Sequence, residues 1–118
     1  LQQLEGVTWK ERIVSLAKRR TTIFEIIFHY RIAADLRRFD SPYLTQDNRR
    51  VLRIEFEMIN ACLSETARAD TIGTAGIYAL LSFANWQSLR QDQELSAEDA
   101  RDVVLRLLDS ALSRFSDS

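Results

Sequence analysis

The chain has 118 residues, enough for one domain built around a single core. Its 46% hydrophobic and 28% charged residues exclude a disordered chain, and its net charge of −1 argues against nucleic-acid binding through a broadly basic surface. One proline and three glycines leave few interruptions, which favours long helices over a turn-rich all-β fold. We therefore expect a single all-α domain over residues 1–118, a bundle of about five helices.

The charge is unevenly distributed along the chain. Residues 1–38 carry a net charge of +4, and residues 92–118 carry −4. A basic first third would suit an acidic partner or another domain, whereas an ordinary solvated helix face would look the same. The sequence leaves both interpretations open.

Two capping signatures mark the first helical region. Thr8 and Glu11 form a capping box, which predicts a helix starting near Trp9. Because the signature repeats at Thr22–Glu25, residues 8–38 form either one long helix or two, and we favour a break near residues 20–22. The Asp-Ser-Pro sequence at 40–42 should end this region, since the residue before a proline avoids the α conformation.

The next helix is expected to start around Thr45–Asp47 and to run to about Ser64. A polar segment at 64–70 should follow, with Asp70 or Thr71 as the cap of the next helix. The stretch Ile72–Leu89 has no charged residue and is apolar on more than one face. This pattern predicts a central helix that its neighbours cover on most sides.

The last helix has the clearest amphipathic pattern in the chain. Ser96 is the expected cap, and acidic residues follow in the first turn. Its apolar residues recur every three or four positions at Ala100, Val103, Val104, Leu107, Leu108, Ala111, Leu112 and Phe115.

No residue pattern supports catalysis, a metal or a cofactor. His29 is the only histidine, and with Glu25 it could supply two ligands from one helix, whereas zinc needs three or four. Cys62 lies in an apolar stripe on a different predicted helix, where a structural thiol is more common than a nucleophile. Gly73 and Gly76 lie inside a helical pattern and not in a phosphate-binding loop. We expect no enzymatic activity, no metal and no cofactor.

Cysteine usage and the lack of targeting patterns bear on location. The single cysteine allows no intrachain disulfide, which indicates a reducing compartment. We see no signal-peptide pattern, and the uncharged stretch is too short and too polar at Asn85 and Gln87 to span a membrane. We expect a cytoplasmic protein with no membrane partner.

Large aromatic residues on three predicted helices could surround a cavity for a small apolar or amphipathic molecule. The alternative is that they fill an ordinary core. The candidate ligand-binding residues are Phe24, Phe28, His29, Phe56, Met58, Tyr78, Ser82 and Trp86.

The last two predicted helices carry more apolar surface than a single bundle of this size can cover. An exposed patch that pairs with a second copy of the chain would give a four-helix interface. The candidate dimer residues are Ile77, Leu81, Ala84, Val104, Leu108, Ala111 and Phe115.

Two stretches carry a family resemblance. Residues 23–44, IFEIIFHYRIAADLRRFDSPYL, are similar to a helix and proline turn in some TetR-family transcriptional regulators. Residues 75–112, AGIYALLSFANWQSLRQDQELSAEDARDVVLRLLDSAL, resemble the last two helices of those regulators and the capped loop between them. The chain thus resembles the C-terminal ligand-binding and dimerisation domain of that family.

The resemblance implies a bacterial homodimer that binds an unidentified small-molecule effector. It also implies DNA binding only through an N-terminal helix-turn-helix domain, whose sequence we do not find in this chain. The expected function is therefore effector sensing and dimerisation in a transcriptional regulator. The alternative is a stand-alone helical adapter that binds a partner protein's helix in an exposed apolar groove.

Overall fold

A computed structural model describes residues 4–118 of the chain; residues 1–3 of the predicted 1–118 domain lie outside this range. The described residues form seven α-helices and no strand, so the all-α prediction is confirmed and the helix number is larger than expected. The molecule measures 44 × 31 × 29 Å along its principal axes. The helices are α1 (Trp9–Ile26), α2 (Phe28–Arg37), α3 (Pro42–Cys62), α4 (Glu65–Ala69), α5 (Thr71–Leu80), α6 (Phe83–Gln87) and α7 (Ala97–Leu112), with short turns η1 (Arg38–Asp40) and η2 (Ser88–Asp92).

Helix α1 begins where the capping box predicted. The Thr8 hydroxyl accepts a hydrogen bond from the Glu11 backbone N–H at 3.1 Å. The predicted break near residues 20–22 is wrong, because α1 continues to Ile26 and the chain bends at Ile27. The hydroxyls of Thr21 and Thr22 donate to the Lys18 carbonyl within the helix, so neither threonine caps a new one.

Helix α3 starts earlier than the expected 45–47. Ser41 is its cap and accepts from the Leu44 backbone N–H at 3.3 Å, while Pro42 occupies the first helical turn. Proline is well suited to this position because the first turn has no use for its missing N–H. The predicted proline stop is confirmed, since α2 and η1 end before Ser41.

The stretch Ile72–Leu89 is not one central helix. It is divided into α5, α6 and the π-helical turn η2, and the polar segment before it forms the short helix α4. The expected cover by neighbours is found in part of the stretch: Phe83, Trp86 and Leu89 are buried on α6 and η2. On α5, Thr74 and Ile77 alone are buried. Asp70 caps α5 as predicted by accepting from the Gly73 N–H at 2.9 Å.

Three side chains create the break between α5 and α6. The Ser82 hydroxyl donates to the Ala79 carbonyl at 2.7 Å, the Asn85 amide donates to Leu80, and Arg20 of α1 donates to Leu81. These bonds satisfy carbonyls that have lost their helical partners. Ser82 also caps α6 by accepting from the Asn85 backbone N–H.

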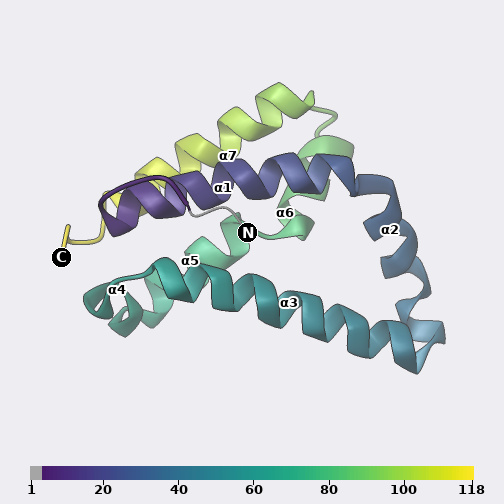
Figure 1. The fold of residues 1–118 in the computed structure, drawn as a ribbon. Helices are drawn as coiled ribbons and strands as arrows, with labels where there is room; N and C mark the ends of the chain where they lie inside the picture. Colours follow the sequence, from purple (N-terminus) through teal and green to yellow (C-terminus); the bar gives the residue numbers. More distant parts are fainter. Residues whose placement is uncertain (1–3) are drawn as a thin grey trace.

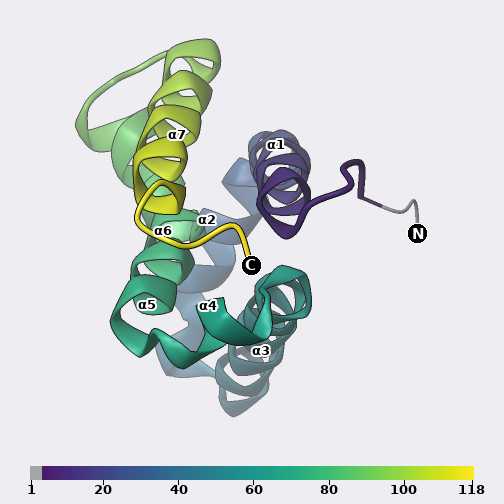
Figure 2. The same cartoon turned by 90° about the vertical axis from the view of Figure 1, so that its left-hand side faces the viewer.

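Helix α7 begins at the predicted cap, Ser96, which accepts from the Asp99 N–H. Helices α1 and α7 lie side by side and run in opposite directions, and α3 lies below them (Figure 1). Figure 2 shows α1 and α3 nearly end-on, with α7, α6 and α5 following one another from top to bottom on the left of the view. The Lys10 ammonium joins the start of α1 to the end of the chain by donating to the Phe115 carbonyl at 2.7 Å.

The core lies where α1, α3, α7 and the segment from α5 to η2 meet. It contains four residues of the stripe predicted on the last helix, Ala100, Val104, Leu108 and Leu112, and burying such apolar side chains supplies the main stabilisation of the bundle. Leu107 of that stripe is 50% exposed. The largest fully buried side chains of the core are Ile13, Leu16, Ile59, Ile77, Trp86 and Leu108. In residues 4–118 we find no helix with the length and apolar character needed to cross a bilayer.

Candidate functional site

A cavity of about 190 Å³ lies where α1, α3 and α5 meet. Helix α3 supplies one wall, α5 supplies the opposite wall, and Arg20 reaches in from α1. The rings of Phe56 and Tyr78 lie 5.2 Å apart across the α3–α5 contact. The full lining is Arg20, Leu52, Glu55, Phe56, Ile59, Tyr78, Ala79 and Ser82.

The spacing of residues on each helix brings these side chains together. Arg20 continues the inward stripe of Ile13, Leu16 and Ala17 on α1, and Glu55 lies one turn before the buried Ile59 on α3. Helical periodicity therefore places a cation and an anion on faces that are otherwise apolar.

The charged side chains at the cavity are held by specific partners. Arg20 is only 6% exposed, and its guanidinium donates to the carbonyls of Glu55 at 3.0 Å and of Leu81 at 3.4 Å. The Glu55 carboxylate is bound by both terminal nitrogens of Arg31, at 2.8 and 3.0 Å. Burial lowers the pKa of Arg20 from its ordinary value, and the nearby Glu55 carboxylate partly opposes that shift.

Of the predicted ligand residues, the structure brings three to this cavity: Phe56, Tyr78 and Ser82. Phe56 and Tyr78 offer aromatic surface, and the Tyr78 hydroxyl makes no hydrogen bond with residues 4–118. Ser82 is committed to its caps on both sides of the helix break, so its role there is structural.

The other predicted ligand residues lie elsewhere. Phe24, Phe28 and Trp86 are buried, and Phe24 and Phe28 both pack against the ring of Phe83, so these three belong to the core. His29 and Met58 are exposed and do not line the cavity.

The Glu25 side chain, considered above as a partner of His29 in a metal site, instead binds Arg90 and Trp86. Its carboxylate accepts from Arg90 Nη2 at 2.6 Å and from the Trp86 indole at 3.1 Å. The bond from Arg90 is the main cause of a lowered Glu25 pKa. No group of three or more metal-binding side chains occurs within the described residues.

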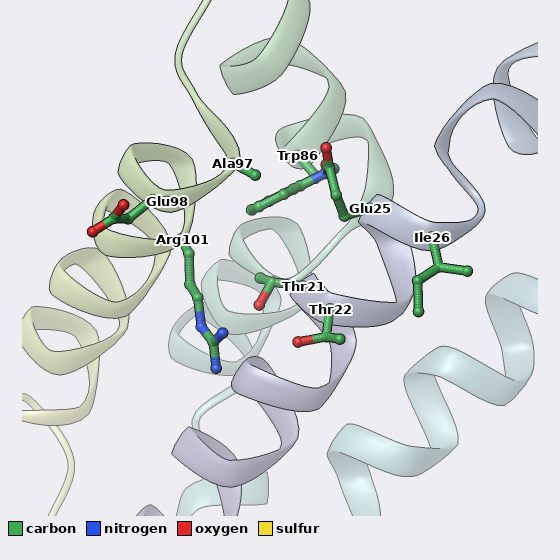
Figure 3. A pocket seen from close by; sticks show the side chains of 8 residues that line it. All are labelled: Thr21, Thr22, Glu25, Ile26, Trp86, Ala97, Glu98 and Arg101. Carbon is green, nitrogen blue, oxygen red and sulfur yellow. Dashed lines mark hydrogen bonds between the residues drawn. The ribbon is translucent and has the colours of Figure 1, made fainter.

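A second, more open hollow of about 380 Å³ lies between α1, α6 and α7 (Figure 3). Arg101 extends from α7 toward Thr21 and Thr22 of α1, while Glu25 and Trp86 form the far end. Both threonine hydroxyls donate to the Lys18 carbonyl, so neither offers a free donor to a ligand. The hollow is lined by two acidic residues, Glu25 and Glu98, and by one basic residue, Arg101, and the Glu25 carboxylate is already bound by Arg90.

Comparison of the chain with protein-family models, with curated proteins and with solved structures finds no match. The functional assignment consequently depends on the residues themselves and on the geometry of the cavity.

Cys62 is buried, and burial raises the pKa of its thiol from the ordinary value. A raised pKa reduces the thiolate population, which is opposite to what an activated nucleophile needs.

Most of the predicted dimer residues are buried in the chain's own core. Four of them, Ile77, Leu81, Val104 and Leu108, are at most 2% exposed. Phe115 is half-buried, with its ring packed edge-on against Trp9 at 5.6 Å. The patch predicted on these residues is therefore internal, because the inward stripe of α7 faces α1 and α5 of the same chain. Ala111 is half-buried, and Ala84 is exposed.

Two features of this region escaped the sequence reasoning. Arg20 was not a candidate, although its position on the inward stripe of α1 is a readable signal. The Glu25–Arg90 pair joins residues 65 positions apart, and no local sequence pattern predicts it.

Proposed function

We propose that the chain is the effector-sensing and homodimerisation domain of a TetR-like transcriptional regulator. The observation that carries the proposal is the cavity between α1, α3 and α5, with an aromatic pair on its walls and a buried arginine at its side. A preformed concave site with a few polar groups among apolar walls is the usual form of a small-molecule site. The resemblance of residues 23–44 and 75–112 to that family supports the same assignment.

The surface proposed for the dimer is the outer face of α5, with the neighbouring part of α7. Ile72 is 83% exposed and Leu107 is 50% exposed. Ala75 and Gly76 complete an exposed face of α5 that has no charge and little side-chain bulk. These residues replace the internal ones as candidate contacts, because a second helix can approach such a face closely.

Helix α5 connects the two activities. Tyr78 and Ala79 line the cavity, whereas Ile72 and Gly76 lie on the same helix away from it. A ligand that binds one arrangement of α5 more tightly shifts the population toward that arrangement. In a regulator of this class, the shift would change the spacing of helix-turn-helix domains outside this chain, which carry the DNA contact.

Sedimentation equilibrium of the chain tests the dimer. Gly76→Arg places a long cation on the proposed interface, and it has room in a single chain because a Cβ at Gly76 meets nothing within 4 Å. We expect a dimer for the unchanged chain and for the control Gly76→Ala, and a monomer for Gly76→Arg. A monomeric unchanged chain at micromolar concentration, or a dimer that survives Gly76→Arg, contradicts the proposed interface.

One observation favours the adapter function instead. Large apolar side chains are exposed around α2, η1 and the start of α3, namely Ile26, Tyr30, Leu36, Phe39 and Tyr43. An exposed apolar surface of this kind is typical of a protein-binding site. The adapter function predicts a monomeric chain that binds an apolar dye, with binding reduced by Phe39→Ser together with Tyr43→Ser. A dimer that depends on Gly76 would favour the sensor.

A further inference from the structure

Arg20 is a buried cation without an anion of its own. Its two hydrogen bonds go to backbone carbonyls, and its remaining N–H groups have no acceptor within residues 4–118. Arginine side chains that are this deeply buried are normally paired with a carboxylate. The site is therefore electrostatically incomplete.

The one carboxylate near Arg20 is already used. Both terminal nitrogens of Arg31 bind Glu55, and the side chains of this ion pair are 11% and 16% exposed. The Arg31 guanidinium, on α2, also lies 4.8 Å from the centre of the Phe83 ring of α6. The cluster of Arg20, Arg31 and Glu55 therefore carries one surplus positive charge.

The rest of the cavity is suited to an apolar group. Leu52 and Ile59 supply aliphatic surface, and Phe56 and Tyr78 supply two ring faces. A volume of about 190 Å³ suits a molecule of one ring with a short side chain rather than a drug-sized ligand.

We propose that this cavity binds a small aromatic monocarboxylate, whose carboxylate pairs with Arg20 and whose ring packs against Phe56 and Tyr78. The proposal depends on the effector-sensing function and specifies the chemical class of its ligand. A monoanion matches the single surplus charge, and the planar guanidinium fork matches a carboxylate. A phosphate would bring more charge than one arginine can balance.

Isothermal titration calorimetry with matched probes tests the ligand class. Phenylacetate is the acidic probe, and phenylacetamide and 2-phenylethanol are neutral molecules of the same shape. We expect phenylacetate to bind about tenfold or more tightly than either neutral probe, because a charge-assisted hydrogen bond to a buried cation is lost with them. Equal binding of acid and amide would overturn the proposal.

Two sets of variants connect that preference to the site. Arg20→Met removes the cation and keeps an apolar side chain of similar length, and we expect it to abolish the preference for the acid. Ala79→Leu reduces the volume of the cavity without changing any charge, and we expect it to weaken the binding of every probe. Ala61→Leu is the matched control, since it makes the same change at an exposed residue of α3 that lies outside the cavity and outside the proposed dimer face. An acid preference that survives Arg20→Met overturns the assignment to Arg20.

The outcomes separate this proposal from the proposed function. Suppose that the neutral probes bind as tightly as phenylacetate and that Ala79→Leu weakens the binding of all three. The cavity is then a binding site, and the carboxylate assignment is wrong. If Ala79→Leu leaves the binding of every probe unchanged, as Ala61→Leu does, the cavity is not the site, and the effector-sensing proposal fails with it. If Arg20→Met does not fold, the comparison of acidic and neutral probes, together with Ala79→Leu and its control, still tests the proposal.

Discussion

Gly73 and Gly76 lie three residues apart on α5, yet a side chain would meet different surroundings at each. A Cβ at Gly73 would lie 2.7 Å from Cζ of Phe115 and 2.5 Å from a carboxylate oxygen of Asp70. A Cβ at Gly76 would meet nothing within 4 Å. Gly73 thus allows the end of the chain to pack on α5, whereas Gly76 has no such role within a single chain.

The two glycines provide a matched prediction for stability. Gly76→Ala should raise the free energy of unfolding by about 1 kcal/mol, because alanine favours the helix and no contact opposes it. Gly73→Ala should lower it, since the Phe115 ring has to move and the Asp70 cap is disturbed. Urea denaturation of both variants measures the difference. A Gly73→Ala chain as stable as Gly76→Ala would show that the Phe115 contact contributes nothing.

The Glu25 carboxylate gives the chain a defined pH dependence. Its folded-state pKa is lowered, chiefly by the hydrogen bond from Arg90, so its contribution to stability is present above the unfolded pKa of about 4.3 and is lost as pH falls through the folded value. We expect Glu25→Gln to lower the free energy of unfolding by about 1 kcal/mol at neutral pH, because the side chain is partly exposed. The loss should become progressively smaller as the pH falls below the unfolded pKa of about 4.3. The exposed Glu57→Gln on α3 is the control and should show little effect at any pH. Urea denaturation at several pH values across this range measures the difference in free energy of unfolding between Glu25→Gln and the unchanged chain. A difference that grows on acidification would contradict the lowered pKa.

At the scale of elements, α2 and α3 are joined by the ion pair between Arg31 and Glu55. Glu55→Met should destabilise the fold by about 3 kcal/mol, because it leaves two buried guanidinium groups, Arg31 and Arg20, without their nearest carboxylate. The double variant Arg31→Met with Glu55→Met should recover most of that loss, since an apolar pair of similar size often replaces a buried ion pair without cost. Denaturant unfolding of the single and double variants measures this, and equal losses in the two would contradict it.

Helix starts were predictable from the sequence where the capping residue is local. Thr8, Asp70 and Ser96 each accept from a backbone N–H three residues later, as their sequence patterns indicated. Ser41 makes the same bond ahead of Pro42, and the start of α3 was placed late because the proline was interpreted only as a stop.

The break between α5 and α6 could not be predicted in the same way. Its carbonyls are satisfied partly by Arg20, a residue 61 positions away on another helix. Without that donor, the uncharged sequence at 72–89 is an acceptable continuous helix, and local propensity favours it. The same tertiary contact explains why the site was only partly predictable. Phe56 and Tyr78 were found as aromatics, whereas Arg20 was obscured by the basic run around it.

The predicted dimer surface shows a related limit. The 3-4 spacing on α7 correctly identified an apolar face, but spacing does not say whether that face meets the same chain or another. In the structure, α1 and α5 cover it, and Val104 and Leu108 are buried. What remains for a partner is the residues at the edges of the stripe, such as Leu107.

At the scale of the whole molecule, the cavity and the proposed dimer face share helix α5, which has few buried residues of its own. A ligand held between Arg20 and Tyr78 connects α5 to α1 and α3 and restricts its movement. When the ligand has already restricted α5, less conformational entropy is lost as a second copy of the chain binds to that helix. Ligand binding should therefore strengthen dimerisation.

This coupling is measurable in both directions. Saturating phenylacetate should tighten the dimer dissociation constant by about fivefold in sedimentation equilibrium, and dimer formation should tighten phenylacetate binding by the same factor, because linkage between two equilibria is reciprocal. Ala79→Leu should remove the effect of phenylacetate on the dimer, while Ala75→Leu, on the outer face, should weaken the dimer and leave phenylacetate binding to the monomer unchanged. If phenylacetate binds in the cavity and the dimer constant stays the same, α5 does not transmit binding, and the cavity and the dimer face act independently.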